Sequence, residues 1–290
     1  ASVAAAAAAE RSRRVLVNAS GASRGVHRRG TRYVFQVPAP TAEYGAGALE
    51  VAIAMGYRRL HVVARNDPTA RESAARLAQL ALARGLEPGE VQAIAPGARD
   101  YAMQIAAARA RNAEAWIAFG QPEDAAEMVK SFRRIGYAPW LFLAQGAAEP
   151  RFLQFVGRDA EFALGLTAYD TRFATRGNAA FVQAWRKRWQ GEPGALAAAA
   201  YSAALVLEEA VRKAGGFEQE SLREALAALD TETPIGRYRV DDTGAQVAAR
   251  PAVMQVLAGR SELVWPRALA TAQWRLPYPR WDERQANAAQ

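Results

Sequence analysis

The chain has 290 residues, 51% of them hydrophobic and 23% charged, a globular balance with length enough for one two-lobed protein or two domains. It contains no cysteine, which excludes disulfides and thiolate metal sites, and no metal-binding motif surrounds its two histidines, His27 and His61. The formal charge is +8, but the basic residues are nearly all arginine and are spread along the whole chain, which favours a solvated basic surface over a nucleic-acid interface.

The first segment is predicted to be an Ala-rich helix. Ala4–Ala9 is a short apolar run whose charges come after it, whereas a signal peptide carries basic residues in front. If the protein is exported to the periplasm, we therefore expect its leader to be absent from this sequence. No apolar run reaches the roughly 18 residues that a membrane-spanning helix needs, so none is predicted.

The next part of the chain alternates between short apolar strands and helices. Strands are predicted at residues 15–17, 33–37, 59–63, 91–95, 115–119 and 140–144. Helices are predicted at residues 42–56, 69–84, 101–111 and 122–135. Pro68, Pro122 and Pro150 each lie near a helix start, where a missing N–H costs nothing. This alternation indicates an α/β fold with parallel sheets covered by helices on both faces.

Helices dominate the last third of the chain. Phe181, Trp185 and Trp189 recur at every fourth position of a predicted helix, which indicates a stripe facing the core. The helix at 196–214 is apolar on nearly every side up to Leu207, which predicts a buried helix. The chain is then predicted to form a helix at 219–229 and strands that begin at residues 235 and 251. The tail at 269–290 is expected to lie extended over the surface and to become disordered after about residue 284.

One segment matches a catalytic motif. Gly21-Ala-Ser-Arg-Gly25 has the Gly-x-Ser-x-Gly pattern of serine hydrolases, in which the serine turn leads directly into a helix and the histidine comes late in the chain. Here a strand is predicted to follow, and the last histidine is His61, so a hydrolase using Ser23 is the weaker alternative. Glycine motifs for phosphates or dinucleotides do not occur. We expect no catalytic residue, no metal and no cofactor.

Residues 178–244 resemble a known family. Their features come in the order aromatic stripe, Gly-Glu-Pro turn, Ala-rich helix with Tyr201, Ala-Gly-Gly stop at 214–216, and a polar strand ending in Asp-x-x-Gly at 241–244. This order resembles the C-terminal half of the type I periplasmic solute-binding proteins, the Leu/Ile/Val-binding family of ABC importers. The resemblance implies a two-lobed type I periplasmic-binding-protein fold whose first lobe is incomplete in this chain.

The resemblance also implies a domain division and a function. Lobe I would comprise 1–40 and 168–245, and lobe II would comprise 41–167 and 246–268, with 269–290 as the tail. The protein would be a periplasmic receptor and not an enzyme. It would close its interlobe cleft on a small organic solute and deliver that solute to the membrane permease of an ABC importer. A monomer without a nucleic-acid partner is expected, and the alternative is a ligand-sensing regulatory domain of the same fold.

The ligand-binding residues implied by the resemblance lie in loops that follow strands, with one at the start of the first helix. They are Ser2, Ser20, Ala22, Ser23, Thr69, Phe119, Gln121 and Gln145. The family's usual threonine for a ligand carboxylate falls at Ala22, with Ser23 beside it as a substitute donor. Gln145 stands where amino-acid binders carry an acid for the ligand ammonium. This amide favours a carboxylate without an ammonium, an amide or an aromatic acid over an α-amino acid.

Overall fold

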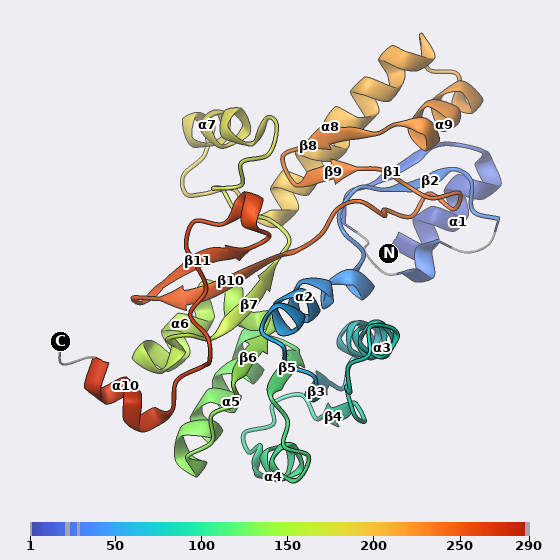
Figure 1. The fold of residues 1–290 in the computed structure, drawn as a ribbon. Coiled ribbons are helices and arrows are strands. Elements are labelled where there is room, and N and C mark those ends of the chain that lie inside the picture. Colours follow the sequence, from blue (N-terminus) through green and yellow to red (C-terminus); the bar gives the residue numbers. More distant parts are fainter. Residues whose placement is uncertain (1, 21–23, 28–29, 288–290) are drawn as a thin grey trace. The chain divides into compact units, whose positions relative to one another are not determined.

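The chain forms two compact units. The computed structural model describes residues 2–20, 24–27 and 30–287 (Figure 1). Unit 1 comprises Ala1–Thr41 and Ala168–Pro251, and unit 2 comprises Ala42–Thr167 and Ala252–Gln290. The chain passes between the units three times. The last passage falls after Pro251, whereas the sequence placed it after residue 245, and the tail at 269–290 belongs to unit 2.

Unit 2 is built on a seven-stranded sheet with the order β11-β10-β7-β6-β5-β3-β4. Its strands are β3 (Leu60–Arg65), β4 (Gln92–Ile94), β5 (Ala115–Phe119), β6 (Leu141–Ala144), β7 (Leu164–Thr167), β10 (Ala252–Leu257) and β11 (Arg260–Trp265). The strands from β3 to β7 are parallel, and β10 and β11 are antiparallel to their neighbours. Every residue of β5 is buried, as expected for a strand in the middle of a parallel sheet covered on both faces.

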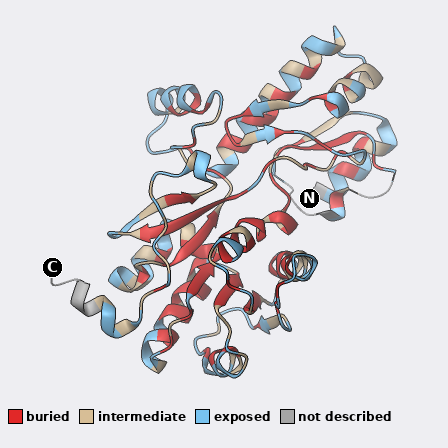
Figure 2. Ribbon diagram, viewed as in Figure 1, coloured by how far each residue is buried: buried red, intermediate tan, exposed pale blue. Residues whose placement is uncertain are grey.

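Helices surround this sheet. They are η2 (Thr41–Glu43), α2 (Ala46–Ala54), α3 (Pro68–Ala83), α4 (Ala102–Ala110), α5 (Pro122–Ile135), η3 (Gln145–Ala148), α6 (Pro150–Val156), η4 (Gly157–Ala160), η5 (Arg267–Leu269) and α10 (Trp281–Asn287). Proline occupies the first turn of α3, α5 and α6, which confirms the predicted starts. Two buried clusters form the core, one containing Leu60 and Ile117 and the other Trp116 and Phe132 (Figure 2).

The tail of unit 2 is anchored by aromatic contacts. Tyr278 is 2% exposed, and the Trp281 indole nitrogen donates to the Tyr137 carbonyl oxygen at 2.7 Å. Residues Trp281–Asn287 form α10, and two acidic residues in its first turn favour a helix N-terminus. The expectation of an extended tail that becomes disordered after residue 284 is therefore wrong for this segment, because ring packing and local charge stabilise a helix there.

Unit 1 contains less sheet than unit 2. β1 (Leu16–Asn18) and β2 (Val34–Gln36) form a parallel pair, and β8 (Thr231–Thr233) and β9 (Gly236–Tyr238) form an antiparallel hairpin. Its helices are α1 (Ser2–Ser12), η1 (Arg24–Val26), α7 (Asn178–Arg188), α8 (Ala195–Ala214) and α9 (Gln219–Ala228). Phe35 and Tyr238 are almost fully buried, at 2% and 0% exposure. The core of this unit is thus shared between short strands and Ala-rich helices.

The predicted aromatic stripe of α7 is only partly buried. Phe181 is 5% exposed and its ring stacks on Tyr201 at 4.7 Å. Trp189, by contrast, is 60% exposed, because α7 ends at Arg188 and Trp189 has an extended backbone as its C-cap. The helical periodicity therefore stops one residue before the last aromatic ring, and the core prediction is wrong for Trp189.

The prediction of a fully buried α8 is also wrong. Leu196, Tyr201 and Leu207 are 67%, 42% and 37% exposed. The buried face of α8 consists mainly of small residues such as Ala198 and Ala203. Small side chains let this face of the helix pack closely against its neighbours. The larger residues Leu196, Tyr201 and Leu207 lie on the outer side of α8. Mean apolarity around a helix thus did not reveal which face is covered.

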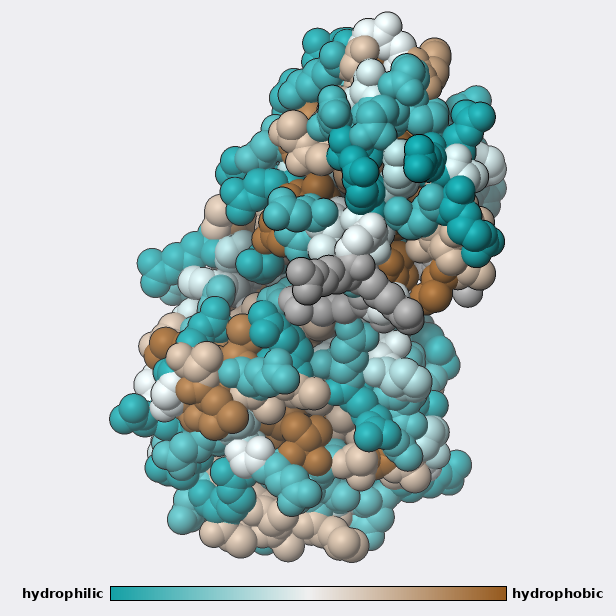
Figure 3. Space-filling view, turned by 90° about the vertical axis from the view of Figure 1, so that its right-hand side faces the viewer, coloured by the Kyte–Doolittle hydropathy of each residue, from teal (hydrophilic) through white to brown (hydrophobic). Residues whose placement is uncertain are grey.

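The surface is mostly hydrophilic on the face drawn in Figure 3, where hydrophobic residues gather in small, separated patches. Small apolar patches are normal on protein surfaces and do not by themselves indicate a binding face. Within the described residues, none of the helices combines the length and the apolarity needed to span a membrane.

Candidate functional site

Three loops of unit 2 meet at the edge of the sheet where its parallel strands end. They follow β3, β5 and β6, which are neighbours in the sheet, and they carry Thr69, Gln121 and Gln145. Open α/β sheets bind their ligands at this carboxyl edge, because the loops converge there while the strands themselves are covered by helices. We call this region the carboxyl-edge site.

A buried carboxylate joins the first two loops. Asp124 is 2% exposed, and its Oδ2 lies 3.1 Å from Arg65 Nη1 at the end of β3. The same oxygen accepts the Gln121 backbone N–H at 2.9 Å, which completes a capping box at the start of α5. Arg65 also lies 3.5 Å from Asp67. Because a buried ion pair with several hydrogen bonds is costly to break, these contacts hold the two loops in one arrangement.

The third loop packs directly on the second. A Cβ placed on Gly146 would lie 2.4 Å from the Gln121 carbonyl carbon, and one on Gly120 would lie 2.7 Å from Asp124 Oδ2. Gly146 therefore needs to be glycine, because a side chain there would collide with the backbone of the neighbouring loop, whereas one at Gly120 would displace the Asp124 carboxylate. The carboxyl-edge site is in this way a connected set of loops, and its backbone geometry is set before any ligand arrives.

The predicted residues of unit 2 occupy different environments at this edge. Thr69 is exposed near the start of α3, where its N–H donates to the N-cap Asp67 at 3.0 Å. Gln121 is exposed, and Gln145 is half-buried at the start of η3. Phe119 is 0% exposed and belongs to the core beneath the sheet, so only its backbone reaches the edge. The surface of the site is thus formed by one hydroxyl and two amides.

The predicted residues of unit 1 are less fully described. Ser20 is exposed after β1, and its N–H donates to Asn18 Oδ1 at 3.3 Å. Ser2 is the first residue of α1. Ala22 and Ser23 lie outside the described residues. Asn18 itself is 7% exposed at the end of β1.

His61 is a core residue rather than an accessible base. It is 1% exposed in β3, and its ring centroid lies 4.5 Å from that of Trp116. Burial, aided by the nearby Arg111 charge, lowers the pKa of His61 to about 4. A neutral imidazole that is buried against Trp116 is not accessible as a general base.

Sequence reasoning missed Arg65 and Asp124. Neither residue was predicted as a site residue, because the strand was predicted to end at residue 63 and Asp124 falls inside the predicted helix at 122–135. The two are separated by 59 residues in the chain, so no local pattern pairs them. A usable signal did exist, since an acid at the third position of a helix that starts with proline is typical of a capping box and therefore of an inward-facing carboxylate.

A family model described as periplasmic binding protein matches residues 1–261. The chain belongs to this family. Its α/β architecture, with a mostly parallel sheet flanked by helices, confirms the resemblance to the type I periplasmic solute-binding proteins and the fold class predicted from it.

Solved structures share the fold of this periplasmic binding protein at low identity. A putative branched-chain amino acid ABC transporter protein from Rhodospirillum rubrum is 21% identical with a TM-score of 0.82, covering 90% of this chain and 76% of that one. A leucine-binding protein from Thermotoga maritima is 22% identical with a TM-score of 0.73, covering 90% and 75%. A solute-binding protein from R. palustris in complex with benzoate is 16% identical with a TM-score of 0.69, covering 95% and 74%.

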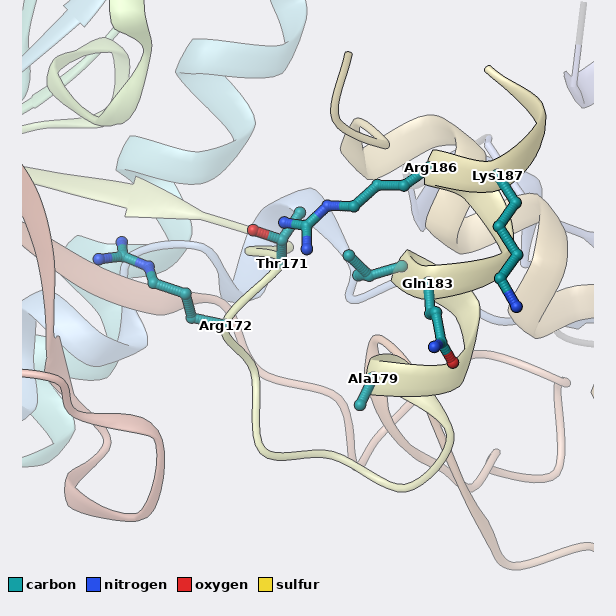
Figure 4. Close-up of a pocket in the computed structure, with 7 residues that line it drawn as sticks. Thr171, Arg172, Ala179, Gln183, Arg186 and Lys187 are labelled. Carbon is teal, nitrogen blue, oxygen red and sulfur yellow. The ribbon is translucent and has the colours of Figure 1, made fainter. Parts of the chain in front are cut away.

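Unit 1 of this periplasmic binding protein has a hollow of its own beside α7 (Figure 4). Its volume is about 510 Å³, and it is lined by Thr171, Arg172, Ala179, Val182, Gln183, Arg186 and Lys187. Figure 4 shows Arg186 extending toward Thr171 and Arg172 pointing away from α7. Arg172 is paired with Asp170 and Arg186 with Glu192, each at 2.9 Å. Because both guanidinium groups are already paired and none of the predicted residues lines this hollow, the carboxyl-edge site is the stronger candidate.

The described residues were compared with the side-chain groups that hold metal ions. No group of three or more His, Asp or Glu residues is placed among these described residues to hold an ion. The polar groups of the carboxyl-edge site are two amides, a hydroxyl and Arg65 with its two carboxylate partners, Asp67 and Asp124. Because both carboxylates are already paired with Arg65, these groups suit hydrogen bonds to an organic ligand rather than ligation of a cation.

Proposed function

We propose that this chain is the extracytoplasmic solute-binding protein of an ABC importer. Membership of the periplasmic binding family supports this role, and so does a preformed loop cluster at the carboxyl edge of the unit 2 sheet. The proposed partners are a small organic solute and a membrane permease. Catalysis is not part of the proposed role.

The observation that carries the proposal is the chemistry of the polar side chains at the carboxyl-edge site. Gln145 makes no side-chain hydrogen bond within the described residues, although it is half-buried at the start of η3. Thr69 and Gln121 are exposed on the neighbouring loops. An amide can donate to a carboxylate or pair with another amide, but it supplies no negative charge for an ammonium. The proposed solute is therefore a small carboxylic acid or amide, including aromatic acids, without an α-ammonium group.

Hinge closure is the proposed mechanism. A solute that contacts the closed form better than the open form shifts the population toward closure, and a permease that recognises the closed form receives only loaded protein. Unit 1 is proposed to contribute four residues to solute binding, which are Ser2, Ser20, Ala22 and Ser23. Unit 2 is proposed to contribute Thr69, Gln121 and Gln145, together with the backbone at Phe119.

Leucine and 4-methylpentanoate provide a direct test, because they differ only by the ammonium group. Thermal-shift and calorimetric titrations would compare both with benzoate and benzamide. A ligand that binds only the folded state raises the melting temperature. We expect the wild type to prefer a ligand without an ammonium, and Gln145→Glu to gain leucine affinity by about tenfold, since a charge-assisted hydrogen bond contributes about 1.5–3 kcal/mol.

Gln79→Glu is the matched control, because Gln79 is exposed on α3 away from the strand ends. It adds the same negative charge and should leave all four affinities unchanged. A folded wild-type protein that responds to none of the ligands, or a preference for leucine that Gln145→Glu does not increase, would contradict the proposal.

A further inference from the structure

A second, larger hollow of unit 2 lies at the opposite edge of the same sheet. Its volume is about 1380 Å³. Its walls come from Phe162 just before β7, from the turn between β10 and β11, and from the tail at 271–284. The parallel strand β7 begins here, whereas the loops of the carboxyl-edge site follow strand ends. We call this hollow the amino-edge cavity.

Arginine dominates the charges of the amino-edge cavity, with five arginines facing three carboxylates. The carboxylates are already engaged. Glu161 accepts the backbone N–H groups of Ala258 and Gly259 at 2.6 and 3.0 Å, and Glu262 accepts the Thr271 hydroxyl at 2.5 Å. Asp159 is paired with Arg133 at 2.5 Å. These acids stabilise the walls, and among the described residues Asp159 neutralises one of the five guanidinium groups, that of Arg133.

Three guanidinium groups are left with hydrogen-bonding capacity toward the cavity. Arg158, Arg260 and Arg275 are exposed and make no side-chain hydrogen bond or ion pair within the described residues. Arg284 differs from these three, because its Nε donates to the Pro279 carbonyl oxygen at 3.1 Å and its Nη1 donates to the Asp159 carbonyl oxygen at 3.4 Å.

Aromatic rings hold Arg284 in place and line the same space. Its guanidinium carbon lies 4.0 Å from the Tyr278 ring centre and 4.1 Å from that of Trp281. Trp274, Trp281 and Phe162 are cavity-lining residues. Flat rings beside guanidinium groups offer both stacking surfaces and bidentate hydrogen bonds to carboxylates. This combination matches a ligand with a planar apolar body and several negative groups.

We propose that the amino-edge cavity is a second small-molecule site, which binds a planar organic polyanion of the aromatic polycarboxylate class. The site does not depend on the proposed solute, since it shares no residue with the carboxyl-edge site. Its volume exceeds the roughly 300–1,000 Å³ of ordinary ligand pockets, so it accommodates ligands larger than a single ring.

Benzene-1,3,5-tricarboxylate is a suitable probe, and calorimetric titration of the whole protein measures its affinity and stoichiometry. We expect one equivalent to bind the wild type with a Kd below 1 mM, on the order of the weakest specific affinities. Arg158→Gln/Arg275→Gln should weaken binding tenfold or more, and propane-1,2,3-tricarboxylate, which lacks the ring, should bind at least about fivefold more weakly than the probe. The exposed Arg267 lies outside the cavity, so Arg267→Gln is the matched control and should bind like the wild type.

Several results would overturn the proposal. They are the absence of probe binding to the folded wild type, an equal loss in Arg267→Gln, and equal affinities for the aromatic and aliphatic tricarboxylates. Loss of probe binding in Gln145→Glu would place the probe at the carboxyl edge and would also overturn it. Circular dichroism and melting temperature verify that each variant is folded. Failure of the solute titrations leaves this test intact, because it uses a different ligand and different side chains.

Discussion

The two units achieve burial in different ways. In unit 2, Trp116 and Phe132 are 0% exposed on one face of a seven-stranded sheet, and Ile117 is 0% exposed on the other. Unit 1 has a two-stranded pair and a hairpin, and its aromatic residues extend from the buried Phe181 to the exposed Trp189. A central strand that is covered on both faces buries every side chain, whereas a helix beside a narrow sheet is covered on one side only.

This difference predicts which substitutions should lower the free energy of unfolding most. A cavity in a core that is enclosed on all sides cannot collapse easily, so unit 2 should be the more sensitive to loss of a ring. In unit 1 a partly exposed neighbour can move into the space.

Phe132→Ala should have the largest effect. The Phe132 ring lies 4.9 Å from Trp116, 5.2 Å from Tyr137 and 5.0 Å from Phe142, measured between ring centres. We expect the free energy of unfolding of unit 2 to fall by about 3–5 kcal/mol. Phe181→Ala in unit 1 is the matched substitution and should remain near the lower end of that range, about 3 kcal/mol. Urea unfolding, followed by hydrogen exchange in each unit, measures the loss of unfolding free energy in both variants. Equal losses in the two units would contradict the comparison.

Acid should destabilise unit 2 through His61. Its folded-state pKa is about 4, below the ordinary 6.5, so the unfolded chain binds a proton that the folded chain excludes. The stabilising effect of the neutral ring is therefore complete above about pH 6.5 and is lost as the pH falls toward about 4, at a cost of up to about 3 kcal/mol.

His61→Phe keeps a ring beside Trp116 and removes the titrating group. The free energy of unfolding of this variant should depend less on pH between about 6.5 and 4 than that of the wild type, because only the wild type takes up this proton on unfolding. Identical pH profiles for His61→Phe and the wild type would disprove the assignment.

Gly146→Ala tests how tightly the carboxyl-edge loops pack. The added Cβ would lie 2.4 Å from the Gln121 carbonyl carbon, so the loop must shift. We expect a loss of about 1–3 kcal/mol and weaker solute binding, because overpacking displaces Gln121. Gly216→Ala in unit 1 meets nothing within 4 Å and should change stability by less than about 0.5 kcal/mol. Thermal melts of the two variants measure both effects. An unchanged melting temperature for Gly146→Ala would contradict the tight packing of the loops.

Trp189→Ala should have the smallest effect. Trp189 is 60% exposed and follows the last residue of α7. We expect a change within about 0.5 kcal/mol, as for most surface positions. Tyr201→Ala should cost more, about 1 kcal/mol, because its ring stacks on the buried Phe181 at 4.7 Å. A larger loss for Trp189→Ala than for Tyr201→Ala in urea titrations would show that the end of α7 is more buried than its exposure indicates.

Much of the secondary structure follows from local sequence. Strand 115–119 and helix 122–135 were predicted with their observed bounds. The strand is a continuous apolar run, and the helix begins with Pro122 and ends at Gly136, which adopts a left-handed conformation. These signals act over a few residues and need no knowledge of the rest of the chain. The positions of Thr69, Gln121 and Gln145 at strand ends followed from the same alternation.

Burial and pairing required the tertiary structure. The periodicity of α7 predicted a core position for Trp189, but the helix ends one residue earlier. The Arg65–Asp124 ion pair joins residues 59 positions apart, and Gly146 needs to be glycine only because Gln121 lies against it. None of these relations leaves a local pattern, since each depends on which neighbour the fold places beside the residue.

The order of strands and helices, the α/β class and the resemblance to periplasmic solute-binding proteins were all predicted from the sequence. They could be predicted because backbone propensity, alternation and turn chemistry are local properties. Only the tertiary structure decided which apolar faces are covered, how three loops lock around Asp124, and that unpaired arginines and aromatic rings enclose a cavity at the other edge of the sheet. Those features arise from contacts between distant segments, where packing and desolvation rather than local preference set the outcome.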